Sequence, residues 1–123
     1  MNLQPYLFFP GNCTEAMNFY KEVFGGELTT MPNPSGKGVM HADLKGGIIN
    51  LMASDSDRTT PYETCRITLS LNGTDGDKIT ETFNKLAEGG AITSPIKVES
   101  WGDAFGTVTD KFDIDWMVNF AAA

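Results

Sequence analysis

The sequence is poor in histidine, cysteine and basic side chains. Its 123 residues include one histidine, two cysteines and nine basic side chains against sixteen acidic ones, a formal net charge of −7. An acidic chain without a Lys/Arg cluster repels phosphate groups, so we expect no nucleic-acid or membrane partner. Without a C-x-x-C pair and with one imidazole, a zinc knuckle is excluded. Cys13 and Cys65 could form at most one disulfide, and free thiols are the expectation in a cytoplasmic protein.

Long apolar runs and targeting signals are also absent. No stretch approaches the roughly 20 apolar residues that a membrane-spanning helix needs. The N-terminal "MNLQPYLFFPGN" has neither the basic region nor the small-residue cleavage site of a signal peptide, so we expect a cytoplasmic protein. There is no G-x-G-x-x-G, P-loop or G-x-S-x-G motif, which argues against nucleotide-dependent and serine-hydrolase chemistry.

Two amphipathic helices are predicted. The first lies in "GNCTEAMNFYKEVFGG", where Asn12 is a good N-cap and Glu15 has the capping-box spacing. The second lies in "GTDGDKITETFNKLAEGG", with Asp75 or Asp77 as its cap. Both end at a Gly-Gly pair, which is typical of helix C-termini. Each helix has one apolar face, most simply packed on a sheet.

The remaining apolar segments predict eight strands, in the order strand, helix, three strands, and then the same again. Their ranges are 4–9, 27–31, 38–44, 48–53, 66–71, 91–98, 105–109 and 114–120. Shifting the chain on itself by about 64 residues aligns the two helices and their Gly-Gly stops, which indicates a duplicated βαβββ unit. We predict an α+β fold in one domain, with modules at about 1–57 and 64–123. Each half alone would have a marginal core, so the halves should pack together or swap with a partner chain.

This pattern resembles the vicinal oxygen chelate superfamily, which includes glyoxalase I, bleomycin-resistance proteins and extradiol dioxygenases, and within it the PhnB-like branch, often given a demethylubiquinone methyltransferase label. The resemblance rests on "PYLFFPGNCTEAMNFYKEVFGGE", "VMHADLKGG", "IINLMASDSD", "ITLSLN", "LAEGG" and "SWGDAFGTVTDKFDIDWMVN", which cover nearly the whole chain. It implies two modules whose mixed sheets curve around a pocket, and a homodimer. The methyltransferase label finds no support in the sequence, because no glycine-rich nucleotide loop follows the first strand.

The resemblance also implies four inward positions where members of the superfamily hold a metal ion. In this sequence they fall at or next to Pro5, near Asn50, near Arg66 and on Met117. Divalent metals of this class need imidazole and carboxylate ligands, and a guanidinium repels a cation. We therefore predict neither the superfamily's usual metal centre nor another cofactor.

Two polar residues are candidates for a ligand site. His41 is the only imidazole, and its unperturbed pKa suits proton transfer near neutrality. By alternation it shares a strand face with Val39 and Asp43, and it points into the pocket if Met40, Ala42 and Leu44 face the helix. The other interpretation is a half-exposed strand histidine. Arg66 is either a clamp for a carboxylate or phosphate group or a solvated strand terminus.

Aromatic, amide and thioether side chains supply further candidates for ligand binding. Trp101, Phe105 and, less strongly, Trp116 line an aromatic wall or belong to the core. The remaining candidates are two pairs, each on one strand face and in corresponding parts of the modules: Asn50 with Met52, and Met117 with Asn119. The other interpretation for the two methionines is ordinary core packing.

Three acidic or thiol features are expected to have little functional weight. The carboxylates at the turn after residue 109 should be solvated. The resemblance implies a glycine at the position of Asp113, so we expect Asp113 to adopt a left-handed conformation. Asp55 and Asp57 read as a solvated acidic loop. Cys13 lies in the first helical turn, where the helix dipole lowers a thiol pKa, yet no basic partner is evident.

Three hypotheses follow. The first is a metal-free, dimeric protein that binds a small anionic or aromatic molecule. The second is a glyoxalase- or dioxygenase-type enzyme with a rearranged active site around His41. The third is a structural or interaction protein without a cavity. We favour the first, because fold analogy alone does not decide function.

Overall fold

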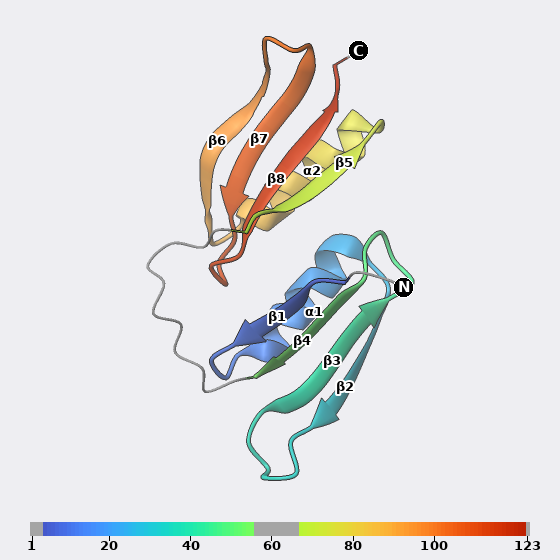
Figure 1. The fold of residues 1–123 in the computed structure, drawn as a ribbon, viewed down its shortest axis with the longest axis vertical. Coiled ribbons are helices and arrows are strands. Elements are labelled where there is room, and N and C mark those ends of the chain that lie inside the picture. Colours follow the sequence, from blue (N-terminus) through green and yellow to red (C-terminus); the bar gives the residue numbers. More distant parts are fainter. Residues whose placement is uncertain (1–3, 56–66, 123) are drawn as a thin grey trace. The chain divides into compact units, whose positions relative to one another are not determined.

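The computed structural model describes residues 4–55 and 67–122 and has the predicted α+β architecture (Figure 1). The chain divides into two compact units, Met1–Pro61 and Tyr62–Ala123. Each unit is a βαβββ module with one helix and one four-stranded mixed sheet, so the predicted duplication is confirmed. None of the helices in these described ranges has the length and apolar character needed to cross a membrane.

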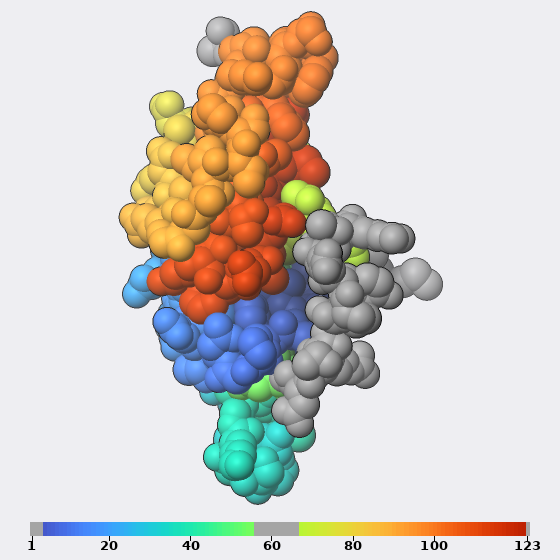
Figure 2. Space-filling model, turned by 90° about the vertical axis from the view of Figure 1, so that its left-hand side faces the viewer, coloured from blue at the N-terminus to red at the C-terminus, as the bar shows by residue number. Residues whose placement is uncertain are grey.

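The first module has strand order β1-β4-β3-β2, with β1 parallel to β4 and the other neighbours antiparallel. Its elements are β1 (Tyr6–Phe9), α1 (Cys13–Phe24), β2 (Glu27–Pro32), β3 (Val39–Lys45) and β4 (Leu51–Asp55). The hairpin turn between β2 and β3, cyan in Figure 2, projects from the body of this module.

The second module repeats the topology with strand order β5-β8-β7-β6. Its elements are β5 (Leu69–Gly73), α2 (Gly76–Ala87), β6 (Ala91–Val98), β7 (Asp103–Thr109) and β8 (Asp115–Ala121). The predicted strands therefore all exist, with ends that differ by a few residues, as is usual for boundaries.

Each sheet has one face covered by its helix and one face that the helix does not cover. In the first module Ala42 and Leu44 of β3 are buried against α1, whose Met17 and Tyr20 are also buried.

In the second module Val108 of β7 and the β8 residues Trp116 and Val118 are buried on the α2 side, together with Phe83 and Leu86 of α2. The opposite side of each sheet, here called its open face, carries the alternate residues.

The N-terminus of α1 differs from the predicted capping box. The Asn12 side chain makes no capping hydrogen bond, and its buried Oδ1 has no hydrogen-bond partner among the described residues. Asp55 takes this role from the end of β4: its Oδ1 accepts from the Gly11 and Cys13 amides at 3.0 and 2.9 Å, and its Oδ2 accepts from the Val39 amide at 2.9 Å. A carboxylate is a stronger acceptor than an amide and favours the positive end of the helix dipole. Reading Asp55 as part of a solvated loop was therefore wrong; Asp57 lies outside the described residues.

The N-terminus of α2 follows the prediction. The Asp75 side chain accepts a hydrogen bond from the Lys78 amide at 3.1 Å, which selects it over Asp77 as the cap.

The turn between β7 and β8 contains a buried carboxylate. Asp110 is 2% exposed; its Oδ1 accepts from the Phe112 and Ile114 amides, and its Oδ2 accepts from Trp116 Nε1 at 2.8 Å. The expectation that all carboxylates of this turn are solvated was therefore wrong for Asp110. Asp113 has a φ of 66°, so the predicted left-handed conformation is confirmed.

Candidate functional site

The open face of the first sheet brings together side chains from β1, β4 and β3. The strand register places Tyr6 of β1 opposite Met52 of β4, and Met52 in turn opposite Asp43 of β3. His41 lies two residues before Asp43, and Phe8 two residues after Tyr6, so both belong to the same face. Elements that are distant in sequence thus meet on one surface.

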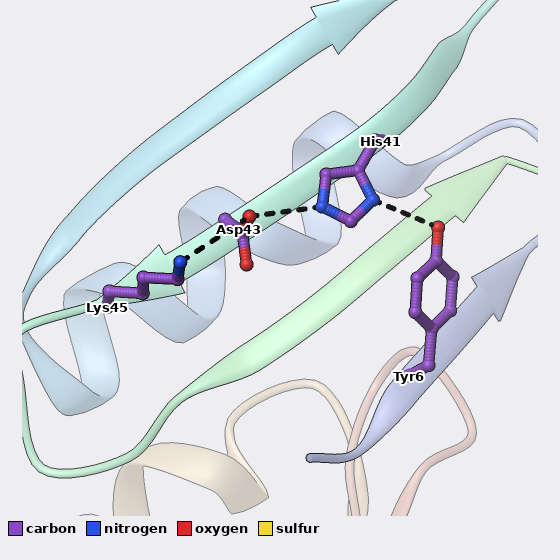
Figure 3. Close-up of polar contacts among 4 residues, drawn as sticks. All are labelled: Tyr6, His41, Asp43 and Lys45. Carbon is purple, nitrogen blue, oxygen red and sulfur yellow. Dashed lines mark hydrogen bonds and ion pairs between the residues drawn. The ribbon is translucent and has the colours of Figure 1, made fainter. Parts of the chain in front are cut away.

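His41 is held between two polar side chains on this surface (Figure 3). Its Nε2 lies 3.0 Å from Asp43 Oδ2, and its Nδ1 lies 3.2 Å from the Tyr6 hydroxyl. Both ring nitrogens are therefore engaged, which fixes the orientation of the imidazole.

Lys45 extends this polar row at its far end (Figure 3). Its Nζ is 4.0 Å from the same Asp43 oxygen that contacts His41. The lysine side chain is largely exposed, so this ion pair contributes little to stability. Asp43 Oδ1, by contrast, is buried and has no hydrogen-bond partner among the described residues.

Aromatic rings flank the polar row and remain accessible to solvent. Tyr6 is 37% and Phe8 is 53% exposed, with ring centroids 5.0 Å apart. The Tyr6 and His41 rings lie 5.7 Å apart. The face therefore presents two accessible aromatic rings, tilted by 36° to each other, next to a hydrogen-bonded imidazole. This arrangement suits aromatic ligands with one polar group.

His41 lies on the open face of the sheet, opposite the buried Ala42 and Leu44, and its strand departs from simple alternation. The pairing of β2 with β3 shifts between Met31 and Pro32: Met31 pairs with His41 and Pro32 pairs with Val39, so Met40 has no partner on β2. Such a bulge reverses the side-chain alternation on one side of it. As a result Val39 is buried and Met40 is exposed, whereas alternation had placed Met40 on the helix side.

One predicted residue of the first module lies outside this group. Asn50 immediately precedes β4 and is exposed, and the position opposite Tyr6 belongs to Met52 instead. Arg66 lies outside the described residues.

The second module has an equivalent row on its own open face. Met117 of β8 lies opposite Ser70 of β5, as Met52 lies opposite Tyr6. Asn119 donates from Nδ2 to Asp103 Oδ2 at 3.1 Å and lies opposite Phe105 of β7. The predicted residues Met117, Asn119 and Phe105 thus share one face.

The three predicted aromatic residues of the second module separate into two groups. Trp101, in the turn between β6 and β7, is 60% exposed and meets Phe105 edge-on at 6.0 Å between centroids. Trp116 is 1% exposed on the helix side. Because neighbouring strand residues point to opposite faces, Trp116 belongs to the core and does not join an aromatic wall.

The Cys13 thiol has no features of a redox centre. It is fully buried, and burial, together with the negative charge of Asp55, raises its pKa to about 11. The expected lowering by the helix dipole is therefore outweighed.

Within residues 4–55 and 67–122, no three His, Cys, Asp or Glu side chains are grouped so that they could hold a metal ion. The open face of the first sheet presents a hydrogen-bonded imidazole and two accessible aromatic rings. Tyr6 and Phe8, which the structure places beside His41, were not among the candidates from the sequence. Alternation alone could place Asp43 beside His41, but the register between β1 and β4 that brings Tyr6 to them leaves no signal in a single sequence.

Comparisons with known proteins agree with this architecture. A family model described as the Glyoxalase/Bleomycin resistance protein/Dioxygenase superfamily matches residues 2–118. The chain is 31% identical to Protein YjdN of Escherichia coli (strain K12) over 139 aligned residues, covering 97% of this chain and 95% of YjdN.

Solved structures show the same similarity. Protein PA1353 from Pseudomonas aeruginosa is 37% identical, with a TM-score of 0.82 and coverage of 98% of both chains. A Bacillus cereus protein described as a putative 3-demethylubiquinone-9 3-methyltransferase, PhnB protein, is 25% identical, with a TM-score of 0.79 and coverage of 98% of this chain and 100% of that one.

Proposed function

The chain belongs to the Glyoxalase/Bleomycin resistance protein/Dioxygenase superfamily, and on that basis we propose that it binds a small aromatic molecule on the open face of the first sheet, without the superfamily's usual metal centre. The observation that carries this proposal is the exposed Tyr6–Phe8 pair beside the doubly hydrogen-bonded His41. Large aromatic side chains on a surface, next to an oriented polar group, are characteristic of binding sites.

The choice of an aromatic over a purely anionic ligand follows from the charges. The polar row contains the Asp43 carboxylate, and its one cation, Lys45, already lies near that carboxylate. An anion would gain little there, whereas a planar ring gains contact area and stacking on Phe8 and Tyr6.

Backbone-amide NMR with two probes tests the proposal. Indole is a neutral aromatic, and naphthalene-2-sulfonate is an anionic one. We expect both to shift amide signals in β1 and β3, and Phe8→Ala to weaken binding by about fivefold, the equivalent of one lost aromatic contact. Ile92→Ala, which removes another exposed apolar side chain in the second module, is the matched control. Shifts that spare β1 and β3, or binding unchanged in Phe8→Ala, would contradict the proposal.

A second candidate function, a glyoxalase- or dioxygenase-type enzyme, is favoured by one observation: His41 is oriented through both ring nitrogens, as catalytic imidazoles are. This candidate predicts turnover of a hemithioacetal or a catechol that falls about 100-fold or more in His41→Gln. Equal turnover rates in the wild-type protein and in His41→Gln would rule out this enzymatic function.

A further inference from the structure

The hydrogen bonds of His41 determine where its proton lies. An ionised carboxylate only accepts hydrogen bonds, so the contact between Asp43 Oδ2 and Nε2 requires the proton on Nε2. In the neutral ring Nδ1 is then an acceptor, and the Tyr6 hydroxyl, 3.2 Å away, donates to it. The row is therefore directed: Tyr6 donates to His41, and His41 donates to Asp43.

The direction of these hydrogen bonds indicates which group a ligand would have to supply. Tyr6 is 37% exposed, and with the hydroxyl proton turned toward His41 its oxygen still has lone pairs that can accept a hydrogen bond from a ligand. Its ring and that of Phe8 form the adjacent aromatic surface. A ligand that completes the row is one whose hydroxyl donates to Tyr6 while its ring lies against Phe8.

We propose that this site takes a weakly acidic hydroxyl compound, a phenol or an enol, and removes its proton through Tyr6 to His41. The inference rests on the proposed function and names the ligand class for the same surface. The ligand O–H bond breaks as its proton moves to the Tyr6 oxygen, and the Tyr6 proton moves to His41 Nδ1. The products are a ligand oxyanion, which accepts a hydrogen bond from Tyr6, and an imidazolium paired with Asp43, so charge and protons balance.

Asp43 is the positioning residue for this proton transfer. It touches His41 and not the ligand, fixes the ring tautomer, and stabilises the imidazolium that proton transfer creates. Lys45 lies 4.0 Å from the same oxygen and is largely exposed, so it offsets this effect weakly.

The ionisation of a chromophoric phenol tests the proposal in the full-length protein. The probe is p-nitrophenol, whose phenolate absorbs in the visible range; p-nitroanisole lacks the hydroxyl and serves to measure ring binding alone. At a pH where most free probe is protonated, we expect the wild-type protein to increase the phenolate band. Tyr6→Phe should abolish the increase while keeping the aromatic ring, and Asp43→Asn should reduce the ionised fraction about tenfold.

The matched control is Glu22→Gln, which also converts a carboxylate to an amide, on an exposed part of α1. It should behave as wild type. Binding of both probes without a phenolate band would overturn the proton transfer while leaving the proposed function intact, and failure of p-nitrophenol to bind would overturn the ligand class.

A second measurement needs no ligand. His41 is the only histidine in the chain, so a protein labelled with ¹⁵N in histidine gives one imidazole spin system. When the ring is neutral, we expect the Nε2–H tautomer. A predominant Nδ1–H tautomer would overturn the inference.

Discussion

At the residue scale, Asp110 and Asp113 show how one turn can hold two carboxylates with opposite environments. Asp110 is buried and accepts from two backbone amides and the Trp116 indole, because an isolated buried charge is costly unless its oxygens are hydrogen-bonded. Asp113 instead provides the left-handed residue that closes the turn. The resemblance to the superfamily predicts the conformation of Asp113, because glycine is usual at that position of the turn. The burial of Asp110 instead depends on Trp116 reaching it from β8.

The left-handed Asp113 leads to a stability prediction. Glycine adopts a φ of 66° without the Cβ strain that aspartate retains, so Asp113→Gly should raise the free energy of unfolding by about 0.5 kcal/mol. Urea unfolding measures the difference. Lys111→Gly, in the same turn and without a positive φ, should lower stability, and a loss of stability in Asp113→Gly would show that the left-handed conformation is not the source of strain.

The buried Cys13 thiol predicts a dependence of stability on pH. Its folded-state pKa of about 11 lies above the ordinary 9.0, so unfolding releases a proton between these two values. The free energy of unfolding should therefore be unaffected by this group below pH 9 and should fall as the pH rises from 9 toward 11, by on the order of 2 kcal/mol.

The measurement for Cys13 is urea unfolding over that pH range in Cys65→Ser and in Cys65→Ser/Cys13→Ala. The double variant should lose the part of the pH dependence that Cys13 contributes, leaving that of the lysines and tyrosines. Identical slopes in both proteins would mean that the thiol titrates at its ordinary pKa.

At the element scale, periodicity predicted both helices and all eight strands, because apolar alternation and Gly-Gly stops are local signals. Two details escaped it. The pairing shift between Met31 and Pro32 exchanges the faces of Val39 and Met40, and the amides at the start of α1 are bound by Asp55, distant in sequence. Both depend on which strand lies beside which, and a single sequence does not encode that register locally.

The Asp55 contacts predict an asymmetry between the two helix N-termini. Asp55→Asn replaces one accepting oxygen by a donor, and both oxygens are in use, so it should cost about 2 kcal/mol. Asp75→Asn is the control, because Asp75 caps α2 through one oxygen and asparagine caps equally well. Urea unfolding measures both, with hydrogen exchange locating the loss in the first module. Equal effects of the two substitutions would contradict the assigned role of Asp55.

At the scale of the whole molecule, each module of about 60 residues has a small core, and large apolar side chains outside the proposed ligand site, such as Val98 and Trp101, remain exposed. Such modules gain stability by further burial, and we therefore propose that the protein is a homodimer. Sedimentation equilibrium should give a mass twice the 13.4 kDa of the chain. A mass of 13.4 kDa at micromolar concentration would contradict this.

The central claim is that the open face of the first sheet binds an aromatic ligand through Tyr6, Phe8 and His41. A crystal structure of the protein with p-nitrophenol tests it most directly, because density shows both where the ring lies and what its oxygen contacts. We predict a ring against Phe8, with its oxygen within hydrogen-bonding distance of the Tyr6 hydroxyl. A ring bound elsewhere with this face empty, or a metal ion coordinated at this face, would contradict the account.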